Sequence, residues 1–435
     1  MQNREYLITF ETKKGRKMHF YQVGGAVRDK ILNRPNQDKD YVVLGGTEAE
    51  MQALGFKKVG KSFPVFLHPK TGEEYALARK EIKTGTKHQD FKFEFTPDIT
   101  LEEDSLRRDF TCNALYFDEE KDEIIDFHNG IEDIGKRILR HISEHFSEDP
   151  LRVLRMCRLA AQLDFSVAPE TMELCRRMVQ NGELQHLSNQ RIWREIEKAL
   201  QSKSFSRFIV TARECGALQA IFPEIDKLWK VPERLDYHPE GNSGEHTLLS
   251  LQAAQSDDAF VNFGTLMHDV GKGETNPQKW PSHKGHDTLG DKVITIIARR
   301  MHLPTTYVKF ARFCALNHMV SHKPLAKVKK QLIEIAIGLH NFPQKIYLDR
   351  FIGVMSADIH GRSYEISPED EDNFIAIVDE LRNLYDKVSS LHLQTIEEFR
   401  ELLSRLKNKE ISREEFQNQK TNLILREIKK YNSKK

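Results

Sequence analysis

The spacing of apolar residues changes near residue 149, and this change limits the fold more than any other feature of the sequence. Before it, short apolar runs typical of strands alternate with helical segments; the runs occupy residues 19–23, 41–44, 64–67, 75–78 and 124–127. From Asp149 onward the strand pattern stops, and apolar residues recur at intervals of three and four, as in Leu151, Leu154 and Leu159. The chain is therefore expected to be an α+β protein, with a small mixed head followed by an all-α remainder.

Breaks in this pattern divide the 435 residues into five expected segments. The helical region is interrupted at Pro223, over residues 239–244 and over residues 277–285, so a further unit is expected to begin near residue 230. The expected segments are an N-terminal extension over 1–17, a head over 18–140, a helical neck and body over 141–229, a second all-α domain over 230–380 and a helical basic tail over 381–435. Met18 is a candidate for the native start, because the first apolar run follows it directly.

Composition indicates the redox state of the cysteines, the location and the kind of partner expected of the protein. The five cysteines are odd in number and far apart, so they are expected to be reduced thiols rather than disulfides or zinc ligands. No stretch of about 18 apolar residues is present, and the N-terminus is too charged for a secretory signal, so a cytoplasmic location without membrane contact is expected. A net charge of +1 gives no sign of a polyanionic partner, and any nucleic-acid site must be a local patch.

A glycine pair follows the first apolar run and opens a helical segment. Gly24 and Gly25 would let a phosphate approach backbone N–H groups at the positive end of that helix, and Arg28 would add a charged fork. By itself, such a pair between a strand and a helix is more often only a tight turn.

Two aspartates, Asp38 and Asp40, stand two residues apart at the mouth of the next strand run. In a strand they would point to the same face, where two carboxylates repel each other unless a cation lies between them. Oxygen ligands of this kind suit Mg²⁺ bound together with nucleotide phosphates, and a solvated turn is the alternative. Glu74, at the start of another strand run, is a candidate third acid.

Together the glycine pair and the two aspartates resemble the polymerase-β-type nucleotidyltransferases. More narrowly they resemble the class II CCA-adding enzymes and the related bacterial poly(A) polymerases. Residues 107–115, which read RRDFTCNAL, are similar to a signature of this family. The resemblance implies a polymerase-β-like head, a nucleotide-binding role for Gly25, Arg28 and Arg108, and catalytic Mg²⁺ at Asp38 and Asp40. It also implies that the lysine-rich stretch between residues 78 and 101 is the family's flexible loop.

The block over residues 148–158 opens the helical region and matches the family's amino-acid template for the incoming base. Asp149 can cap a helix that begins with Pro150, and arginines recur at every third position on one face. A carboxylate and a guanidinium can pair with cytosine or adenine but not with guanine or uracil. The resemblance implies that Asp149 and Arg152 select the base, and that two further arginines hold the triphosphate or orient this pair: Arg155 and Arg158.

A histidine-rich group marks the second domain. His268 and Asp269 stand in the sequence HDVGK, and other histidines flank them at positions 246, 283, 286, 318 and 322. The order His, His-Asp, Asp resembles the HD-domain metal phosphohydrolases, and it implies four metal ligands: His246, His268, Asp269 and Asp358. Imidazole and carboxylate donors fit Mn, Ni, Zn or Fe.

These features predict an enzyme that adds CCA to the 3′ end of tRNA from CTP and ATP, with release of pyrophosphate. The second domain is implied to have phosphatase, 2′-nucleotidase and 2′,3′-cyclic phosphodiesterase activities. The expected partners are tRNA, CTP and ATP, and the expected state is a monomer or weak homodimer. Two alternatives remain at this point: an A-adding enzyme or poly(A) polymerase, and a nucleotide phosphohydrolase whose head only binds RNA.

Overall fold

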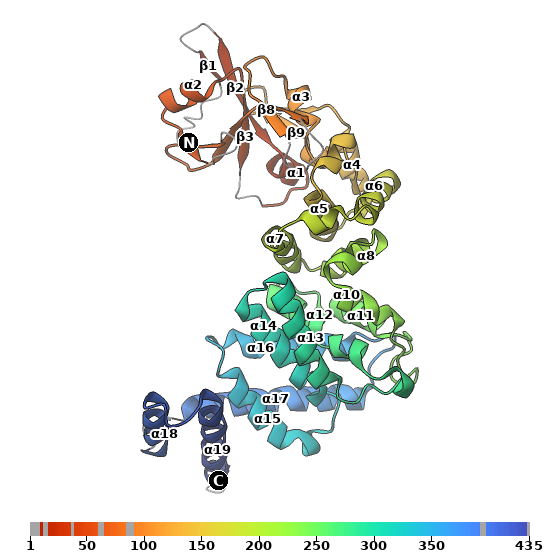
Figure 1. Cartoon of the computed structure of the whole chain (residues 1–435), viewed down its shortest axis with the longest axis vertical. Helices are drawn as coiled ribbons and strands as arrows, with labels where there is room; N and C mark the ends of the chain where they lie inside the picture. The colour runs from red at the N-terminus through yellow and green to blue at the C-terminus, as the bar shows by residue number, and fades with distance from the viewer. Residues whose placement is uncertain are drawn as a thin grey trace. The chain divides into compact units, whose positions relative to one another are not determined.

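The computed structural model of the chain describes residues 9–11, 16–35, 39–59, 65–83, 91–391 and 397–432. The chain divides into two compact units, which are described separately (Figure 1). The first unit comprises Met1–Glu195 and Val210–Ala220, and the second comprises Ile196–Ile209 and Ile221–Lys435. Among the described helices, none is both long enough and apolar enough to cross a membrane.

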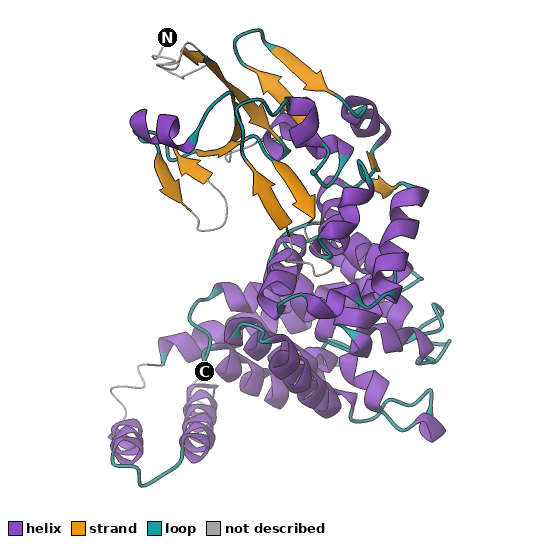
Figure 2. Cartoon of the chain, turned by 45° about the horizontal axis from the view of Figure 1, so that its top comes forward, coloured by secondary structure: helices purple, strands orange, loops and turns teal. Residues whose placement is uncertain are grey.

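A mixed β-sheet forms the centre of the first unit, and its strands are orange in Figure 2. The strand order is β10-β9-β2-β3-β6-β5-β4, and β1 pairs with β2 beside this path. β3 and β6 run parallel, whereas the other neighbouring strands run antiparallel. The bounds are β1 Thr9–Glu11, β2 Lys17–Val23, β3 Asp40–Leu44, β4 Lys57–Val59, β5 Val65–Leu67, β6 Glu74–Leu77, β9 Leu115–Asp118 and β10 Glu123–Asp126.

Alternating apolar side chains give this sheet two covered faces. Tyr41 and Val43 of β3 pack on one face with Met51 of α2 (Glu48–Ala53). Val42 packs on the opposite face with Leu101 of α3 (Leu101–Ser105). The strands predicted from the apolar runs are found within two residues of their expected bounds, and the α+β fold class is confirmed.

Two shorter sheets accompany the main one. β7 (Lys80–Lys83) and β8 (Phe91–Glu94) form an antiparallel pair in the lysine-rich stretch, and residues 84–90 between them lie outside the described residues. β11 (Ile138–Leu139) pairs in parallel with β12 (Ser166–Val167). β12 shows that the expectation of no strand after Asp149 was wrong. It was not predicted because a strand of two residues is too short to show alternation.

Helices make up the rest of the first unit and the passage into the second. α5 begins where expected, because Asp149 accepts a hydrogen bond of 3.0 Å from the Leu151 amide. The boundaries between the two units fall within α7, α8 and α9. The helices are α1 Gly25–Ile31, α4 Gly130–Lys136, α5 Leu151–Leu163, α6 Pro169–Gln180, α7 Asn189–Leu200, α8 Phe205–Glu214, α9 Ala217–Ile221 and α10 Pro223–Asp226.

The second unit contains helices joined by loops and no named strand among its described residues. One of its hydrophobic cores joins α15, α16 and α17 through the buried side chains of Leu332, Phe351 and Leu381. The helices are α11 Ser243–Ala254, α12 Ala259–Met267, α13 His286–Met301, α14 Thr305–Asn317, α15 Leu325–Leu339, α16 Ile346–His360, α17 Pro368–Ser390, α18 Glu397–Lys407 and α19 Arg413–Asn432.

The basic C-terminal segment is anchored by its apolar positions. Ile424 and Ile428 of α19 are each 1% exposed, and they pack into the core of the second unit. A small separate cluster, which includes Phe399 and Phe416, joins α18 to α19. The segment is therefore a packed helix rather than a solvated tail over these positions.

Candidate active sites

One row of residues crosses four strands of the sheet and carries two of the candidate acids. Tyr116 on β9, Val23 on β2, Asp40 on β3 and Glu74 on β6 are paired in register in that order. Residues opposite each other on neighbouring strands project from the same face of a sheet. Asp40 and Glu74 therefore lie side by side, and both are exposed. The other candidate, Asp38, lies outside the described residues.

The glycine turn lies at the end of β2, next to this row. Gly24 has φ of +76°, a left-handed conformation that favours glycine. A Cβ on Gly25 would lie 3.4 Å from Nη2 of Arg28, so this guanidinium folds back against the turn. Arg28 is fixed there because its Nη1 donates to Oδ1 of Asn113 at 2.6 Å and its Nε donates to Oδ1 of Asp29 at 2.9 Å.

A buried acid holds Arg108 beside the same turn. Asp104 is fully buried and pairs with Arg107 at 2.6 Å and with Arg108 at 2.9 Å. The Tyr116 hydroxyl lies 3.0 Å from Oδ2 of Asp104. Burial alone would raise the pKa of Asp104, but the two guanidinium groups hold that pKa well below its ordinary value. A Cβ on Gly24 would lie 3.9 Å from Nη1 of Arg108, so the guanidinium reaches the turn.

Asp149 and Arg152, the two residues expected to select the base, lie at the start of α5 and are partly exposed. Oδ2 of Asp149 pairs with Nη2 of Arg191 at 2.8 Å. Arg152 donates to two backbone carbonyls, those of His145 at 2.6 Å and Arg107 at 2.5 Å. Each therefore has a protein partner within the first unit.

Arg155 and Arg158 are paired with acids inside the first unit. Nε of Arg155 donates to Oδ2 of Asp109 at 2.8 Å, and Nε of Arg158 donates to Glu195 at 2.6 Å. Oδ1 of Asp109 also accepts from Asn113 at 3.1 Å, and Asn113 in turn accepts from Arg28 beside the glycine turn. A continuous hydrogen-bond network thus links the turn to α5.

Three residues that hold the arginines described above in place were not predicted from the sequence. Asp109 and Asn113 stand inside the RRDFTCNAL block but were given no role there. Asp104 could have been found by its spacing, because it precedes Arg107 and Arg108 by three and four residues, which places these side chains on one side of a helical turn.

In the second unit, the four predicted metal ligands meet. His246 lies in α11, Asp358 in α16, and His268 and Asp269 between α12 and the short 3-10 helix η5 (Val270–Glu274). Nε2 of His246 is 3.1 Å from Oδ1 of Asp358 and 3.7 Å from Oδ2 of Asp269. Nε2 of His268 is 3.3 Å from Oδ2 of Asp269 and 3.7 Å from Oδ1 of Asp358. All four side chains are buried.

Backbone carbonyls determine which nitrogen of each ligand histidine faces this cluster. Nδ1 of His246 is 3.0 Å from the Gly361 carbonyl oxygen, and Nδ1 of His268 is 2.6 Å from that of Thr265. A carbonyl only accepts, so Nδ1 carries the proton and Nε2 offers its lone pair to the cluster. Gly361 permits this contact, because a Cβ there would lie 2.3 Å from the Cα of Ser250.

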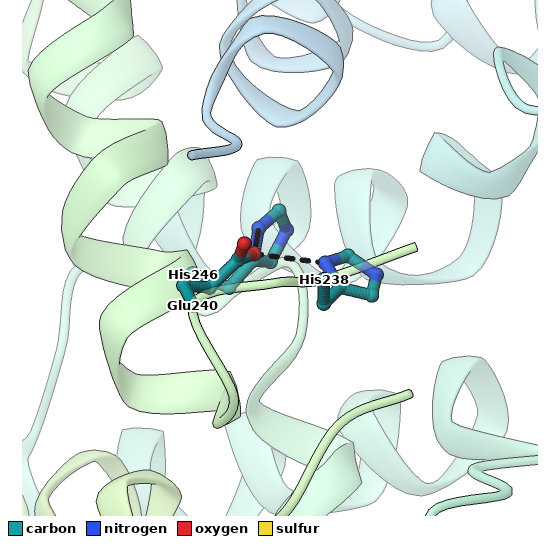
Figure 3. A group of neighbouring side chains, drawn as sticks. All are labelled: His238, Glu240 and His246. Atoms are coloured by element: carbon teal, nitrogen blue, oxygen red, sulfur yellow. Dashed lines mark hydrogen bonds and ion pairs between the residues drawn. The ribbon is translucent and has the colours of Figure 1, made fainter. Parts of the chain in front are cut away.

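Glu240 contacts both His238 and His246, as Figure 3 shows. Its Oε1 is 2.9 Å from Nδ1 of His238 and 3.1 Å from Nδ1 of His246. Because Nδ1 of His246 is the protonated nitrogen, Glu240 accepts a hydrogen bond and orients the ring. Burial alone would lower the pKa of His246, but hydrogen bonds to Asp358 and Glu240 raise that pKa to about 9 in the absence of a metal ion, which would take the place of the proton on Nε2.

The pKa values of both buried carboxylates are held below their ordinary range by neighbouring side chains. Burial alone would raise the pKa of Asp269, but Lys272, whose Nζ is 2.8 Å from Oδ2, holds that pKa well below its ordinary value. Burial likewise opposes ionisation of Asp358, and His322 and His246 lower its pKa.

The cluster fits a divalent metal ion. Nε2 of His268 and Oδ1 of Asp269 are fully enclosed, yet neither has a hydrogen-bond partner among the described residues. Buried polar atoms without partners call for an unseen ligand, and mixed imidazole and carboxylate donors suit a transition metal.

The histidines that received no ligand role are placed unequally. Nε2 atoms of His286 and His318 lie near Asp269, and these three residues form a further group that could hold an ion. His322 faces Asp358, whereas His283 turns to Thr275 and the backbone of Pro232. These histidines were identified in the sequence, but no local pattern distinguishes those that approach Asp269 from those that do not.

Comparison with known proteins agrees with this arrangement of the head. Residues 20–140 match the family described as "Poly A polymerase head domain", and residues 164–228 match "Probable RNA and SrmB- binding site of polymerase A". The sheet, its acids and the first match define the chain as a nucleotidyltransferase.

Relatives narrow the class further. The chain is 44% identical to the multifunctional CCA protein of Nitrosococcus oceani over 348 residues, which cover 80% of this chain and 86% of the relative. It is 45% identical to that of Pseudomonas fluorescens over 350 residues, which cover 79% and 85%. The chain therefore belongs to the family of multifunctional CCA proteins and is a CCA-adding tRNA nucleotidyltransferase.

A solved structure shares the fold. The CCA-adding enzyme of Bacillus stearothermophilus, solved in complex with CTP, superposes with a TM-score of 0.57 at 24% identity. The likeness covers 85% of this chain and 79% of that chain.

Proposed function

We propose that Asp38 and Asp40 form the centre at which the 3′ end of tRNA is extended from CTP and ATP. The observation that carries this proposal is the register that sets Asp40 beside Glu74 on one exposed face, next to the Gly24 turn. Mg²⁺ bound by these oxygens would help the 3′-hydroxyl attack the α-phosphorus and would steady the pyrophosphate that leaves. Arg108, held against the turn by a buried acid, binds the triphosphate.

Base selection is assigned to Asp149 and Arg152. Cytosine and adenine each present an amino donor beside a ring-nitrogen acceptor, so Asp149 accepts from the amino group and Arg152 donates to the ring nitrogen. Guanine and uracil present the reverse order and would leave buried groups unpaired. Arg155 and Arg158, whose guanidinium groups are already paired with acids, position the helix that carries the selecting pair.

Incubation with single nucleotides tests the product. Purified protein is given a tRNA that lacks CCA, together with CTP alone, ATP alone or both, and the products are separated on a sequencing gel. CTP alone should add C, ATP alone should add nothing, and both should complete CCA. Incorporation of A without C would instead indicate an A-adding enzyme or poly(A) polymerase.

We further propose that the second unit hydrolyses phosphoesters, including phosphomonoesters and 2′,3′-cyclic phosphodiesters. The supporting observation is the enclosed group in which two imidazole Nε2 atoms and two carboxylates approach each other, with the lone pairs directed inward. A divalent transition metal held by His246, His268, Asp269 and Asp358 would lower the pKa of a water molecule for attack on phosphorus.

Two reciprocal variants test the division of labour. Asp40→Ala should abolish nucleotide addition and leave hydrolysis of a 2′,3′-cyclic nucleotide unchanged. His268→Ala should have the opposite effect, because its side chain belongs only to the second site. Extension of tRNA by Asp40→Ala would refute the first assignment, and undiminished hydrolysis by His268→Ala would refute the second.

A further inference from the structure

We propose that the second unit binds two divalent transition-metal ions and that Asp269, His286 and His318 hold the second of them. The proposal extends the proposed hydrolytic site, since Asp269 would be shared, with one carboxylate oxygen facing each ion. The first ion would lie with His246, His268 and Asp358. The result is a two-ion centre suited to a phosphoester.

Distances among the three ligand atoms match what one ion requires. Oδ1 of Asp269 is 3.2 Å from Nε2 of His286 and 3.4 Å from Nε2 of His318. The two Nε2 atoms are 3.3 Å apart. Three ligands bound at about 2.1 Å with tetrahedral angles are separated from one another by about 3.4 Å. A single ion therefore fits between them without movement of the backbone.

The hydrogen bonds of the two histidines direct lone pairs toward that position. Nδ1 of His286 is 2.9 Å from the carbonyl oxygen of His283, and Nδ1 of His318 is 3.0 Å from that of Ala315. Both Nδ1 atoms are therefore donors, so Nε2 is the nitrogen that each ring turns inward and can offer to an ion. Two Nε2 atoms and a carboxylate oxygen that face each other in a buried space offer a divalent transition-metal ion three ligand atoms of suitable chemistry.

The Asp269 carboxylate has the position of a bridging ligand. Its Oδ2 faces His246 and His268, whereas its Oδ1 faces His286 and His318. Oδ1 is enclosed and has no hydrogen-bond partner within the described part of the chain. In two-metal sites the ions lie about 3.5–4 Å apart, a spacing that one carboxylate can span with its two oxygens.

His322 shows that closeness alone does not make a ligand. Nη2 of Arg362 lies 2.7 Å from Nδ1 of His322, and because arginine only donates, this Nδ1 is an acceptor. The proton of His322 is then on Nε2, which donates to Oδ2 of Asp358 at 2.7 Å. His322 therefore supports a ligand, whereas His286 and His318 have the form of ligands themselves.

Close packing brings His286 to Asp269. A Cβ on Gly271 would lie 2.0 Å from the carbonyl oxygen of His286 and 2.3 Å from the amide of Gly290. Gly271 lies two residues after Asp269, and only glycine at this position lets α13 begin directly against η5. The HDVGK sequence therefore helps to form the position of the second ion as well as that of the first.

Metal counting on the full chain tests the proposal. The Asp40→Ala background removes binding at the head, the protein is stripped with a chelator and loaded with Mn²⁺, and bound manganese is counted by mass spectrometry. Two ions per chain should remain bound. Their electron paramagnetic resonance spectrum should show the coupling expected of Mn²⁺ ions about 4 Å apart.

Single variants locate the second ion. His318→Ala and His286→Ala should each bind one ion and lose the coupling, with unchanged circular dichroism. His283→Gln serves as the control and should keep two ions, because both nitrogens of His283 face away from the cluster.

The possible results separate this proposal from the hydrolytic function. One ion in the parent protein, with hydrolysis retained, would overturn the second site and leave the hydrolytic function standing. Two ions that persist in both variants would also overturn it. Two ions that fall to one in the variants, without hydrolysis of any ester, would support the second site and refute the hydrolytic function.

Discussion

The Asp109 carboxylate connects Asn113 to Arg155, and this contact makes the stability of the head depend on pH. Burial alone would raise its pKa, but the Arg155 ion pair holds that pKa well below the ordinary value. As the pH falls, the Asp109 carboxylate is therefore protonated in the unfolded chain before it is protonated in the folded protein. The stabilisation present at neutral pH is lost progressively as the pH falls below about 4. Asp109→Asn should lower the free energy of unfolding by about 3 kcal/mol at neutral pH and by less near pH 3, as denaturant titration would measure.

An exposed acid supplies the control for this prediction. Glu132 pairs with Lys136 on the surface of α4, and both side chains are exposed, so Glu132→Gln should leave unfolding unchanged at either pH. A loss in Asp109→Asn that is equal at both pH values would show that the ion pair is not its cause.

Glu240 is expected to set the metal affinity of the second unit without touching an ion. It accepts from Nδ1 of His246 and so increases the basicity of the opposite nitrogen. Glu240→Gln should weaken binding of Mn²⁺ by about 10-fold, measured by calorimetry on stripped protein. Glu245→Gln is the matched control on α11, because Glu245 bonds to Trp229 instead. Equal affinities in the two variants would exclude an orienting role for Glu240.

At the scale of elements, the contact between η5 and α13 depends on Gly271. A methyl group there would meet backbone atoms of His286 and Gly290, which cannot move aside as a flexible side chain would. Gly271→Ala should therefore lower the stability of the second unit by at least about 2 kcal/mol and release bound metal. Thermal unfolding and metal content measure both effects, and nucleotide addition should persist as evidence that the head is intact.

Gly353 provides the comparison within the same unit. It lies in α16, and a Cβ there would make ordinary contacts of 3.4 Å with Val261. Gly353→Ala should be neutral or should stabilise the protein by up to about 1 kcal/mol, because alanine favours helix. If both variants lose metal equally, the close approach at Gly271 is not the cause.

Local patterns predicted the elements better than the contacts between them. The strands that carry Asp40 and Glu74 follow from alternation along the chain, and their shared face follows once the register is known. His286 and His318 could not be grouped with Asp269 from spacing, because they meet only through the packing of α13 and α14. β12 was missed because two residues show no period, and its partner is set by tertiary contact.

At the scale of the whole molecule, the two proposed centres differ in their donor atoms. The head offers carboxylate oxygens, among them Asp40 and Glu74, and hard oxygen donors suit Mg²⁺. The second unit offers imidazole nitrogens beside carboxylates, and His246 and His268 favour a transition metal over Mg²⁺. The two activities should therefore respond to different ions, although one chain carries both.

Chelation followed by selective reloading tests this separation. The full chain is stripped and then supplied with Mg²⁺ alone, Ni²⁺ alone or both, and tRNA extension and cyclic-nucleotide hydrolysis are measured in the same samples. Mg²⁺ alone should restore extension, whereas hydrolysis should need Ni²⁺, since Mg²⁺ binds imidazole poorly. Asp40→Ala and His268→Ala identify which centre each ion serves. If Mg²⁺ alone restored both activities, the histidine cluster would not be the hydrolytic centre, because its nitrogen donors would then have no part in choosing the ion.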